Sequence, residues 1–273
     1  YQNLINKIYP KYNRKTVQNF HNCANMIFKQ AIRDKIIKEN PTRDVVIPKK
    51  AKTLEEIETD PVASKYLTHE EVEDFLQTAQ FHGLRNDVEW FTLLAFSGMR
   101  PGEMLVLKWS DLNFDTNEIS ITKTLFNPKG NTKKYKLTPP KTKGSIRKII
   151  IEQEVMDLLK SLQRRQKKFN MKYRHEIEDF HDEGFVFTKE NGYPYNLNTL
   201  GARMKRLMER SSIKKHATPH IFRHTHVSMM AEAGVDIRTI MEKVGHEDMK
   251  TTSVIYTHVT EKMKKDASMK VRD

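Results

Sequence analysis

The chain has 273 residues, enough for one large domain or two modest ones, with 48 Lys and Arg against 35 Asp and Glu, a net charge of +13. Its single cysteine, Cys23, excludes an intrachain disulfide and a cysteine-based zinc site. No apolar run is long enough to span a bilayer, and no signal-peptide pattern is present. The excess of positive charge favours nucleic acid as a partner, beyond what solubility requires.

A basic helical segment opens the chain. Apolar residues recur at spacings of three and four over residues 4–39, which predicts one helix, and the proline after Asn40 should end it. Residues 1–50 contain 11 Lys and Arg but only three Asp and Glu. We expect this segment to contact DNA phosphates through Lys15 and Lys29, although a solvated basic face would have the same composition.

An acidic stretch without periodicity separates this segment from the rest of the chain. We interpret residues 49–65 as an interdomain linker. It would divide a helical domain of residues 1–48 from a larger domain of residues 66–273. The chain opens on Tyr1 and not on Met, which suggests that the helical domain is incomplete at its N-terminus.

Two helix boundaries precede the first candidate site residue. Thr68 and Glu71 form a capping-box pattern that predicts the start of a helix, and Gly98 predicts the end of the next one. Arg100 follows this glycine at a turn that directs its side chain away from the buried helices. Glu103 lies three residues further on and can hold the guanidinium, although a surface ion pair is the commoner arrangement of such residues.

The strand pattern lies in residues 118–151, where short apolar segments alternate with turns and predict one small sheet. From residue 119 to residue 151 there are nine Lys and Arg and no acidic residue. This one-sided charge suits a phosphate backbone, although charge on an edge strand also deters aggregation. Lys141 and Lys143 lie in the turn before the last strand, and we expect Lys143 and Arg147 to bind DNA.

Two histidine-containing stretches raise the question of a metal. Residues 174–184 are rich in His and acids, but their spacing matches no zinc or calcium pattern. His220 and His224 are four residues apart and could ligate zinc, but no third ligand follows at a usual spacing. We therefore expect no metal site.

The strongest candidate site lies near the end of the chain. Thr218 and the proline after it predict the start of a helix. His220 and Arg223 share one face of its first turn, where the free backbone N–H groups and the helix dipole favour an anion. His246 follows a glycine that ends the next helix, and Tyr256 lies ten residues beyond it.

These motifs together resemble the signature of the tyrosine recombinases, the phage integrase family, over residues 65–260. Residues 12–48 similarly resemble the second half of the core-binding domain of that family. The motifs that carry the resemblance are Ser97-Gly98-Met99-Arg100-Pro101-Gly102-Glu103, His220-Ile221-Phe222-Arg223, Gly245-His246 and Tyr256-Thr257-His258. The implied fold is mainly α with a small antiparallel β-sheet, the DNA breaking-rejoining fold, preceded by a partial helical core-binding domain.

The resemblance implies a reaction in which Tyr256 attacks a DNA phosphodiester and forms a 3′-phosphotyrosine. Arg100 and Arg223 would clamp the non-bridging oxygens, and His220 would accept the tyrosine proton. Lys141 would protonate the leaving 5′-oxygen, with Lys143 as the competing residue. His246 would hold the phosphate by a hydrogen bond, and Glu103 would support the site from behind.

The resemblance also implies the partners. The chain would act on double-stranded DNA as a homo-tetramer, be monomeric when free, and work with accessory DNA-bending or directionality proteins in the cytoplasm of a bacterial host. No cofactor is implied, because the phosphotyrosine bond stores the energy of the cut strand. The segment with Met263, Ala267 and Met269 would dock on a neighbouring subunit or pack on its own domain.

Integration or excision of a phage or mobile element is the activity that we favour. A chromosome-dimer-resolving recombinase of the same family would use the same chemistry. A DNA-binding relative without activity is a second alternative, and the complete set of site residues argues against it. A metal-dependent nuclease is a third, which a chelator would distinguish.

Overall fold

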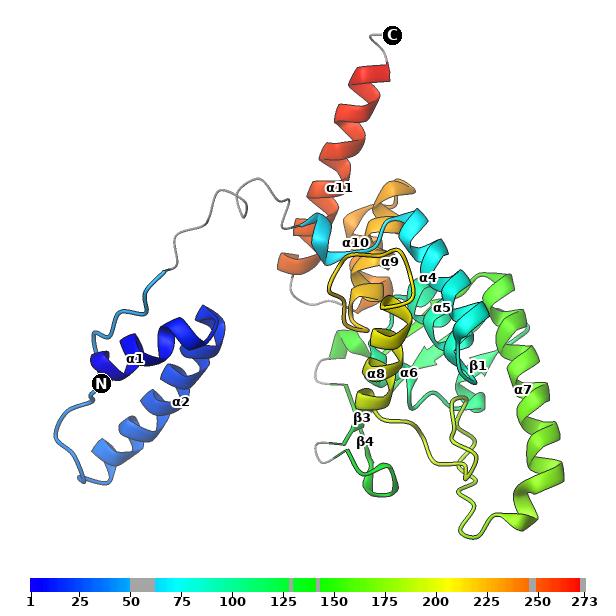
Figure 1. Cartoon of the computed structure of the whole chain (residues 1–273), viewed down its shortest axis with the longest axis horizontal. Coiled ribbons are helices and arrows are strands. Elements are labelled where there is room, and N and C mark those ends of the chain that lie inside the picture. Colours follow the sequence, from blue (N-terminus) through cyan, green and yellow to red (C-terminus); the bar gives the residue numbers. More distant parts are fainter. Residues whose placement is uncertain (50–61, 128–129, 141–142, 246–248, 271–273) are drawn as a thin grey trace. The chain divides into compact units, whose positions relative to one another are not determined.

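A computed structural model describes residues 1–49, 62–127, 130–140, 143–245 and 249–270 (Figure 1). It divides the chain into two compact units, Tyr1–Thr59 and Asp60–Asp273. The division falls within the stretch 49–65, most of which lies outside the described residues.

The described residues of the first unit form two helices. They are α1 (Gln2–Ile8) and α2 (Arg14–Arg33), with a 3-10 turn, η1 (Tyr9–Lys11), between them. The side chain of Asn13 accepts a hydrogen bond from the backbone N–H of Thr16 and so starts α2. Lys15 and Lys29 both lie exposed on α2.

The single helix predicted over residues 4–39 is wrong in two places. Pro10 lies in η1, and a proline inside a helix removes a backbone hydrogen-bond donor, so the helix is interrupted there. At the other end α2 stops at Arg33, because Lys35 adopts a left-handed φ of 56°. The helix therefore ends before Asn40 and its proline are reached.

The second unit is mainly helical, and no helix of the described residues is long and apolar enough to cross a membrane. Its α-helices are α4 (His69–His82), α5 (Asp87–Ser97), α6 (Pro101–Met104), α7 (Gln153–Tyr173), α8 (Leu197–Met208), α9 (Ile221–Glu232), α10 (Ile237–Val244) and α11 (Met249–Lys270). Short 3-10 turns are η2 (Ala63–Lys65), η3 (Trp109–Asp111), η4 (Thr132–Lys134), η5 (Lys143–Ser145) and η6 (Arg174–Glu176). Figure 1 shows the C-terminal half of α11 extending beyond the other helices of this unit.

The strands form two small antiparallel sheets. One has the order β1-β2-β5, from β1 (Leu112–Asn113), β2 (Glu118–Ile121) and β5 (Arg147–Ile150), and the other pairs β3 (Thr124–Phe126) with β4 (Lys136–Thr138). The expected fold class, mainly α with small antiparallel β-structure, is confirmed.

The prediction of one sheet is wrong, because the segment around Tyr135 and Leu137 pairs with an unpredicted strand, β3. The chain leaves the first sheet at Lys123, whose ammonium binds the carboxylate of Asp111 at 2.6 Å (Nζ to Oδ2). After this turn the backbone of β3 is free to pair with β4.

The core of the second unit gathers around α5. Trp90 and Phe91 of this helix are completely buried. The ring of Phe75 from α4 meets those of Phe91 and Phe222 from α9 edge-on, with centroids 5.0 and 5.2 Å apart, an arrangement that aromatic rings favour. Packing on both sides therefore fixes α5 and the turn that follows it.

The predicted helix boundaries compare well with the structure. Thr68 and Glu71 form the predicted capping box at the start of α4, and Gly98 ends α5 in the left-handed conformation. The predicted start, with Thr218 as the N-cap, is two residues early, because the N-cap of α9 is His220. The N–H of Ile221 donates to the carbonyl of Thr218 at 2.8 Å, and this turn comes before the first residue of α9.

Candidate functional site: an arginine cluster at the end of α5

The site is built on the turn that ends α5. Gly98 has a φ of 61°, a conformation that costs little only for glycine. Two residues later Arg100 begins α6 as its N-cap, and its side chain is 34% exposed. A single turn thus leads from a buried helix to a partly exposed guanidinium.

The guanidinium of Arg100 is held by three groups. Its Nη1 donates to Oε1 of Glu103 at 2.8 Å and to Oγ of Ser145 at 3.2 Å, and its Nη2 donates to the carbonyl oxygen of Gly245 at 2.9 Å. The Glu103 side chain is only 1% exposed. The pair is therefore a buried one and not the surface ion pair that we considered as the alternative.

Glu103 is shared with a second arginine. Arg147 Nη2 lies 3.1 Å from Oε2 of Glu103, and Arg147 also donates to the carbonyl oxygens of Lys243 and Ser145 at 2.7 and 3.1 Å. Burial alone would raise the pKa of Glu103, but the charges and hydrogen bonds of Arg147 and Arg100 hold this pKa below its ordinary value. Arg147 thus lies inside the site, whereas we expected it among the residues that bind DNA.

Arg223 joins the cluster from α9. It is completely buried, and its Nη1 donates to the carbonyl oxygen of Gly98 at 2.8 Å. Burial, and then the charges of Arg100 and Arg147, lower the pKa of Arg223 to about 8. Because a guanidinium ordinarily stays charged far above neutral pH, this shift shows how strongly the pocket disfavours its positive charge. An anion placed there would relieve that cost.

Two histidines lie beside Arg223. His220 is the N-cap of α9, and its ring meets that of His224 edge-on with centroids 5.2 Å apart. Burial, then the charges of Arg223 and Arg100, lower the pKa of His220, so this imidazole is neutral near pH 7 and able to accept a proton. Burial is the largest cause that lowers the pKa of His224 to about 4, and the charge of the His220 ring is the next.

Tyr256 lies on α11, which packs against α9 and α10. It is partly buried and contacts an apolar cluster that includes Val227 and Val244. Within the described part of the chain its hydroxyl forms no hydrogen bond, including none to the arginine cluster. Two residues on, Nδ1 of His258 lies 3.2 Å from the hydroxyl of Tyr66, near the start of the second unit.

Two of the predicted site residues, Lys141 and His246, lie outside the described residues, and so does the side chain of Lys143. Their chain neighbours Ser145 and Gly245 do contact Arg100. The structure therefore brings together Arg100, Glu103, His220 and Arg223, and it brings the segments next to Lys141 and His246 to the same cluster. Among the described residues no group of three His, Cys, Asp or Glu is arranged to hold a metal.

Several groups of the site were missed at the sequence level. The carbonyl oxygens of Gly98 and Gly245 hold the two arginines, and a backbone carbonyl has no signature in a sequence. We expected Arg147 to bind DNA because no acidic residue lies near it along the chain. Its carboxylate partner, Glu103, comes from an earlier helix, which only the fold reveals.

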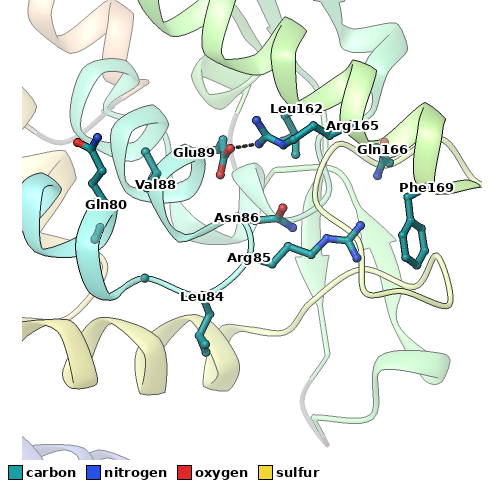
Figure 2. A pocket seen from close by; sticks show the side chains of 12 residues that line it. Gln80, Leu84, Arg85, Asn86, Val88, Glu89, Leu162, Arg165, Gln166 and Phe169 are labelled. Carbon is teal, nitrogen blue, oxygen red and sulfur yellow. Dashed lines mark hydrogen bonds and ion pairs between the residues drawn. The ribbon is translucent and has the colours of Figure 1, made fainter.

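A cavity of about 580 Å³ lies elsewhere, beside the first turn of α5. Figure 2 shows the guanidinium of Arg165, from α7, directed at Glu89. Arg85 lies over the ring of Phe169, with its Cζ 4.6 Å from the ring centroid, and it also pairs with Glu190. Both arginines of this cavity therefore have acidic partners, and none of the predicted site residues lines it.

Comparison with known proteins finds several relatives. The model of the phage integrase family matches residues 65–263. The integrase of Staphylococcus phage L54a is 32% identical over 98% of this chain and 80% of its own length. The prophage ps2 probable integrase of Lactococcus lactis is 32% identical over 92% of this chain and 65% of its own. The chain thus spans about two thirds to four fifths of these two relatives.

A solved structure of the Tn1549 transposon integrase in complex with a circular intermediate DNA is similar as well. It has a TM-score of 0.72 and 25% identity, over 93% of this chain and 79% of that one. A lambda integrase dimer bound to a core site shares the fold, with a TM-score of 0.61 at 14% identity, over 92% of this chain and 62% of that one.

Fold and relatives together define an enzyme of the tyrosine recombinase class, which carries out site-specific recombination. Within this class the resemblance is to integrases of phages and mobile elements. The chain belongs to the phage integrase family.

Proposed function

We propose that this chain cuts and rejoins double-stranded DNA through a 3′-phosphotyrosine formed on Tyr256, in the integration or excision of a phage or mobile element. The observation that carries the proposal is the arginine cluster. Arg100 and Arg223 come from distant parts of the chain and meet at the turn around Gly98. Related integrases with bound DNA support DNA as the substrate.

The two arginines bind the scissile phosphate. The guanidinium of Arg100 is partly exposed, and Arg223 lies near enough for the charge of Arg100 to lower its pKa. Planar guanidinium groups match the geometry of two phosphate oxygens and stay charged. Negative charge on the non-bridging oxygens grows as the tyrosine oxygen attacks, so the cluster stabilises the transition state more than the ground state.

His220 accepts the proton of Tyr256. A tyrosine hydroxyl has an ordinary pKa near 10 and is a weak nucleophile at neutral pH without a base. The pKa of His220 is lowered by burial and by Arg223, which keeps the imidazole neutral until it takes a proton. The bond from Tyr256 to phosphorus forms while the bond from phosphorus to the 5′-oxygen breaks.

Lys141 gives a proton to the departing 5′-oxygen, and His246 donates a hydrogen bond to the phosphate. These two roles rest on the resemblance of the motifs, since both residues lie outside the described part of the chain. The phosphotyrosine ester keeps the energy of the broken ester, so a 5′-hydroxyl can attack it and reverse the steps. The reaction requires no metal or nucleotide.

Glu103 and Arg147 act through Arg100. Glu103 accepts hydrogen bonds from both arginines, and Arg147 is fixed in turn by the carbonyl of Lys243. This arrangement orients Arg100 without placing a carboxylate where the phosphate binds. Glu103 and Arg147 are therefore positioning residues.

Outside the site, Lys15 and Lys29 of α2 are exposed and suit contacts with the DNA backbone, as does Lys143 by sequence. The active form on DNA is a tetramer of a chain that is monomeric when free. Met263 and Met269 of α11 are exposed, which suits docking of this helix on a neighbouring subunit. Accessory DNA-bending or directionality proteins complete the assembly.

A nicked suicide substrate, which traps the covalent complex, tests the proposal. The parent chain should form a covalent protein–DNA adduct with or without a chelator, and Tyr256→Phe should form none. Tyr173→Phe, at the end of α7, is the matched control and should behave as the parent. Adduct formation by Tyr256→Phe would show that another residue is the nucleophile, and loss of cleavage in chelator would favour a metal-dependent nuclease.

A further inference from the structure

His226 is a buried histidine to which the mechanism above gives no role. It lies on α9, three residues after Arg223, and is 3% exposed. Its Nδ1–H donates to the carbonyl oxygen of Ala95 on α5 at 3.0 Å. The imidazole therefore links the helix that carries one phosphate-binding arginine to the helix that ends just before the other.

The same ring is packed against Gly98. A Cβ atom at Gly98 would lie 2.6 Å from Cδ2 of His226 and 3.0 Å from Cγ1 of Val244. Both distances are shorter than atoms of folded proteins tolerate without a shift, so the backbone of Gly98 has a side chain pressed against it from two sides. The position of this residue is thus set by the imidazole and the valine.

The position of Gly98 in turn affects the positions of both arginines. Its carbonyl oxygen accepts the hydrogen bond from Arg223 at 2.8 Å, and the chain reaches Arg100 two residues later. A displacement of Gly98 would therefore move the group that orients Arg223 and the backbone that carries Arg100. The spacing of the two guanidinium groups depends on this one turn.

Stability alone does not account for a histidine here. Nε2 of His226 is buried and has no hydrogen-bond partner in the described part of the chain, and an orphaned buried polar atom is destabilising. A phenyl ring would occupy similar space without that cost, but it would lack the hydrogen bond to Ala95. Compared with phenylalanine, histidine therefore adds the hydrogen bond that links α9 to α5.

We infer that His226 is a positioning residue for the recombination reaction: through Gly98 and Ala95 it sets the spacing at which Arg100 and Arg223 hold the scissile phosphate. The inference rests on the proposed role of these two arginines. It concerns a residue that touches neither the phosphate nor the DNA.

Two variants separate the ring from the hydrogen bond. His226→Phe keeps an aromatic ring and loses the donor, whereas His226→Asn keeps a donor close to the position of Nδ1 and loses the ring. Single-turnover cleavage of the suicide substrate gives both a rate constant and the fraction of active molecules. Loss of folded protein lowers the active fraction, whereas misplacement of the arginines lowers the rate constant.

We expect His226→Phe to keep its melting temperature, DNA affinity and active fraction, and to lose about tenfold to a hundredfold in rate constant, as a small misplacement of reacting groups costs. His226→Asn should recover a large part of the rate. His181→Phe, a histidine outside the cluster, is the matched control and should cleave like the parent. An unchanged rate constant in His226→Phe, or a loss confined to the active fraction, would overturn the inference.

A modified substrate tests whether the effect passes through the arginines. A scissile methylphosphonate has a methyl group in place of one non-bridging oxygen and is neutral. Its cleavage therefore depends less on the positive charge of the two arginines. The rate losses of Arg223→Ala and His226→Phe should both shrink on it. If only Arg223→Ala is relieved, the inference about His226 fails. If Arg223→Ala loses as much on the neutral substrate as on the phosphate, or loses nothing on either, the proposed role of Arg223 fails instead.

Discussion

The two ends of α5 both bring arginines to buried acids, but the described groups that hold the arginines differ between the ends. At the N-terminal end Asp87 is completely buried and accepts from Arg203 at 2.9 Å and from Arg206 at 3.2 Å. Glu89, also buried, pairs with Arg165. The arginines there are balanced by carboxylates, and the cavity beside them is a structural feature.

At the C-terminal end the described residues place one carboxylate beside three guanidinium groups. Glu103 pairs with Arg100 and Arg147, and Arg223 instead donates to the carbonyl of Gly98. A carbonyl oxygen satisfies an N–H donor but removes no charge. Within the described residues, carbonyl oxygens as well as a carboxylate therefore hold the arginines of this end, an arrangement that suits the binding of a phosphate.

The largest expected effect is on the cleavage rate, and it differs between the two ends of α5. Arg100→Ala should lower the single-turnover cleavage rate by about 10²–10³-fold, the loss typical for one group that stabilises transition-state charge. Arg203→Ala, at the other end, should leave the rate constant of its folded molecules unchanged. Equal losses in the two variants would mean that the arginine cluster at the C-terminal end does not mark the site.

The second expected effect is on the free energy of unfolding, and it is larger at the N-terminal end of α5. Asp87→Asn would leave Arg203 and Arg206 without a counter-charge, and breaking a buried pair in this way costs about 3–5 kcal/mol. Urea denaturation should show this loss in the free energy of unfolding. Asp74→Asn is the control, because Asp74 is only partly buried and accepts from Ser212, which carries no charge. A loss at Asp87 as small as that at Asp74 would contradict the comparison.

The third effect concerns how the stability of the protein changes with pH. The C-terminal end of α5 differs here because buried neutral histidines lie beside it. Burial, then the charge of Lys243, lowers the pKa of His226 to about 3, against an ordinary value of 6.5. Between these values the unfolded state binds the proton and the folded state does not, so this histidine makes stability fall as the pH drops below 6.5. The slope approaches about 1.4 kcal/mol per pH unit for one proton.

Denaturation at pH 7 and pH 5 measures this contribution. His226→Phe should lose less stability than the parent over that interval. His175→Phe, at an exposed histidine, serves as control and should follow the parent. The same loss in all three proteins would show that His226 is not the group that takes up the proton.

The smallest expected effect is at the balanced end. The Arg165 side chain is 57% exposed, and ion pairs with an exposed partner contribute about 1 kcal/mol or less. Arg165→Ala should therefore shift the melting temperature only slightly and leave the cleavage rate unchanged. A large loss of cleavage would show that the cavity in Figure 2 takes part in the reaction.

The sequence could indicate the site because its side chains come in separated motifs with a fixed order. Arg100, His220 and Arg223 are recognisable because their motifs together resemble the signature of the tyrosine recombinases, and the structure brings them together. What surrounds them was not predictable. The orienting groups are backbone carbonyls, and Glu103 meets Arg147 across two elements that are far apart in sequence.

The errors in secondary structure have the same origin. Helical periodicity continues through residues 4–39 even though Pro10 and Lys35 interrupt the backbone, since apolar spacing does not report φ. Strand β3 has three residues, too few for a periodic pattern. Such short elements form because a partner strand is close, and that closeness is a property of the fold.

The contact between Tyr66 and His258 has a mechanical consequence. Tyr66 follows the segment that joins the two units, and His258 lies two residues after the proposed nucleophile on α11. The hydrogen bond of 3.2 Å and the contact of the two rings tie the residues just before α4 to α11. A movement of the helix that carries Tyr256 therefore strains this contact at the start of the second unit.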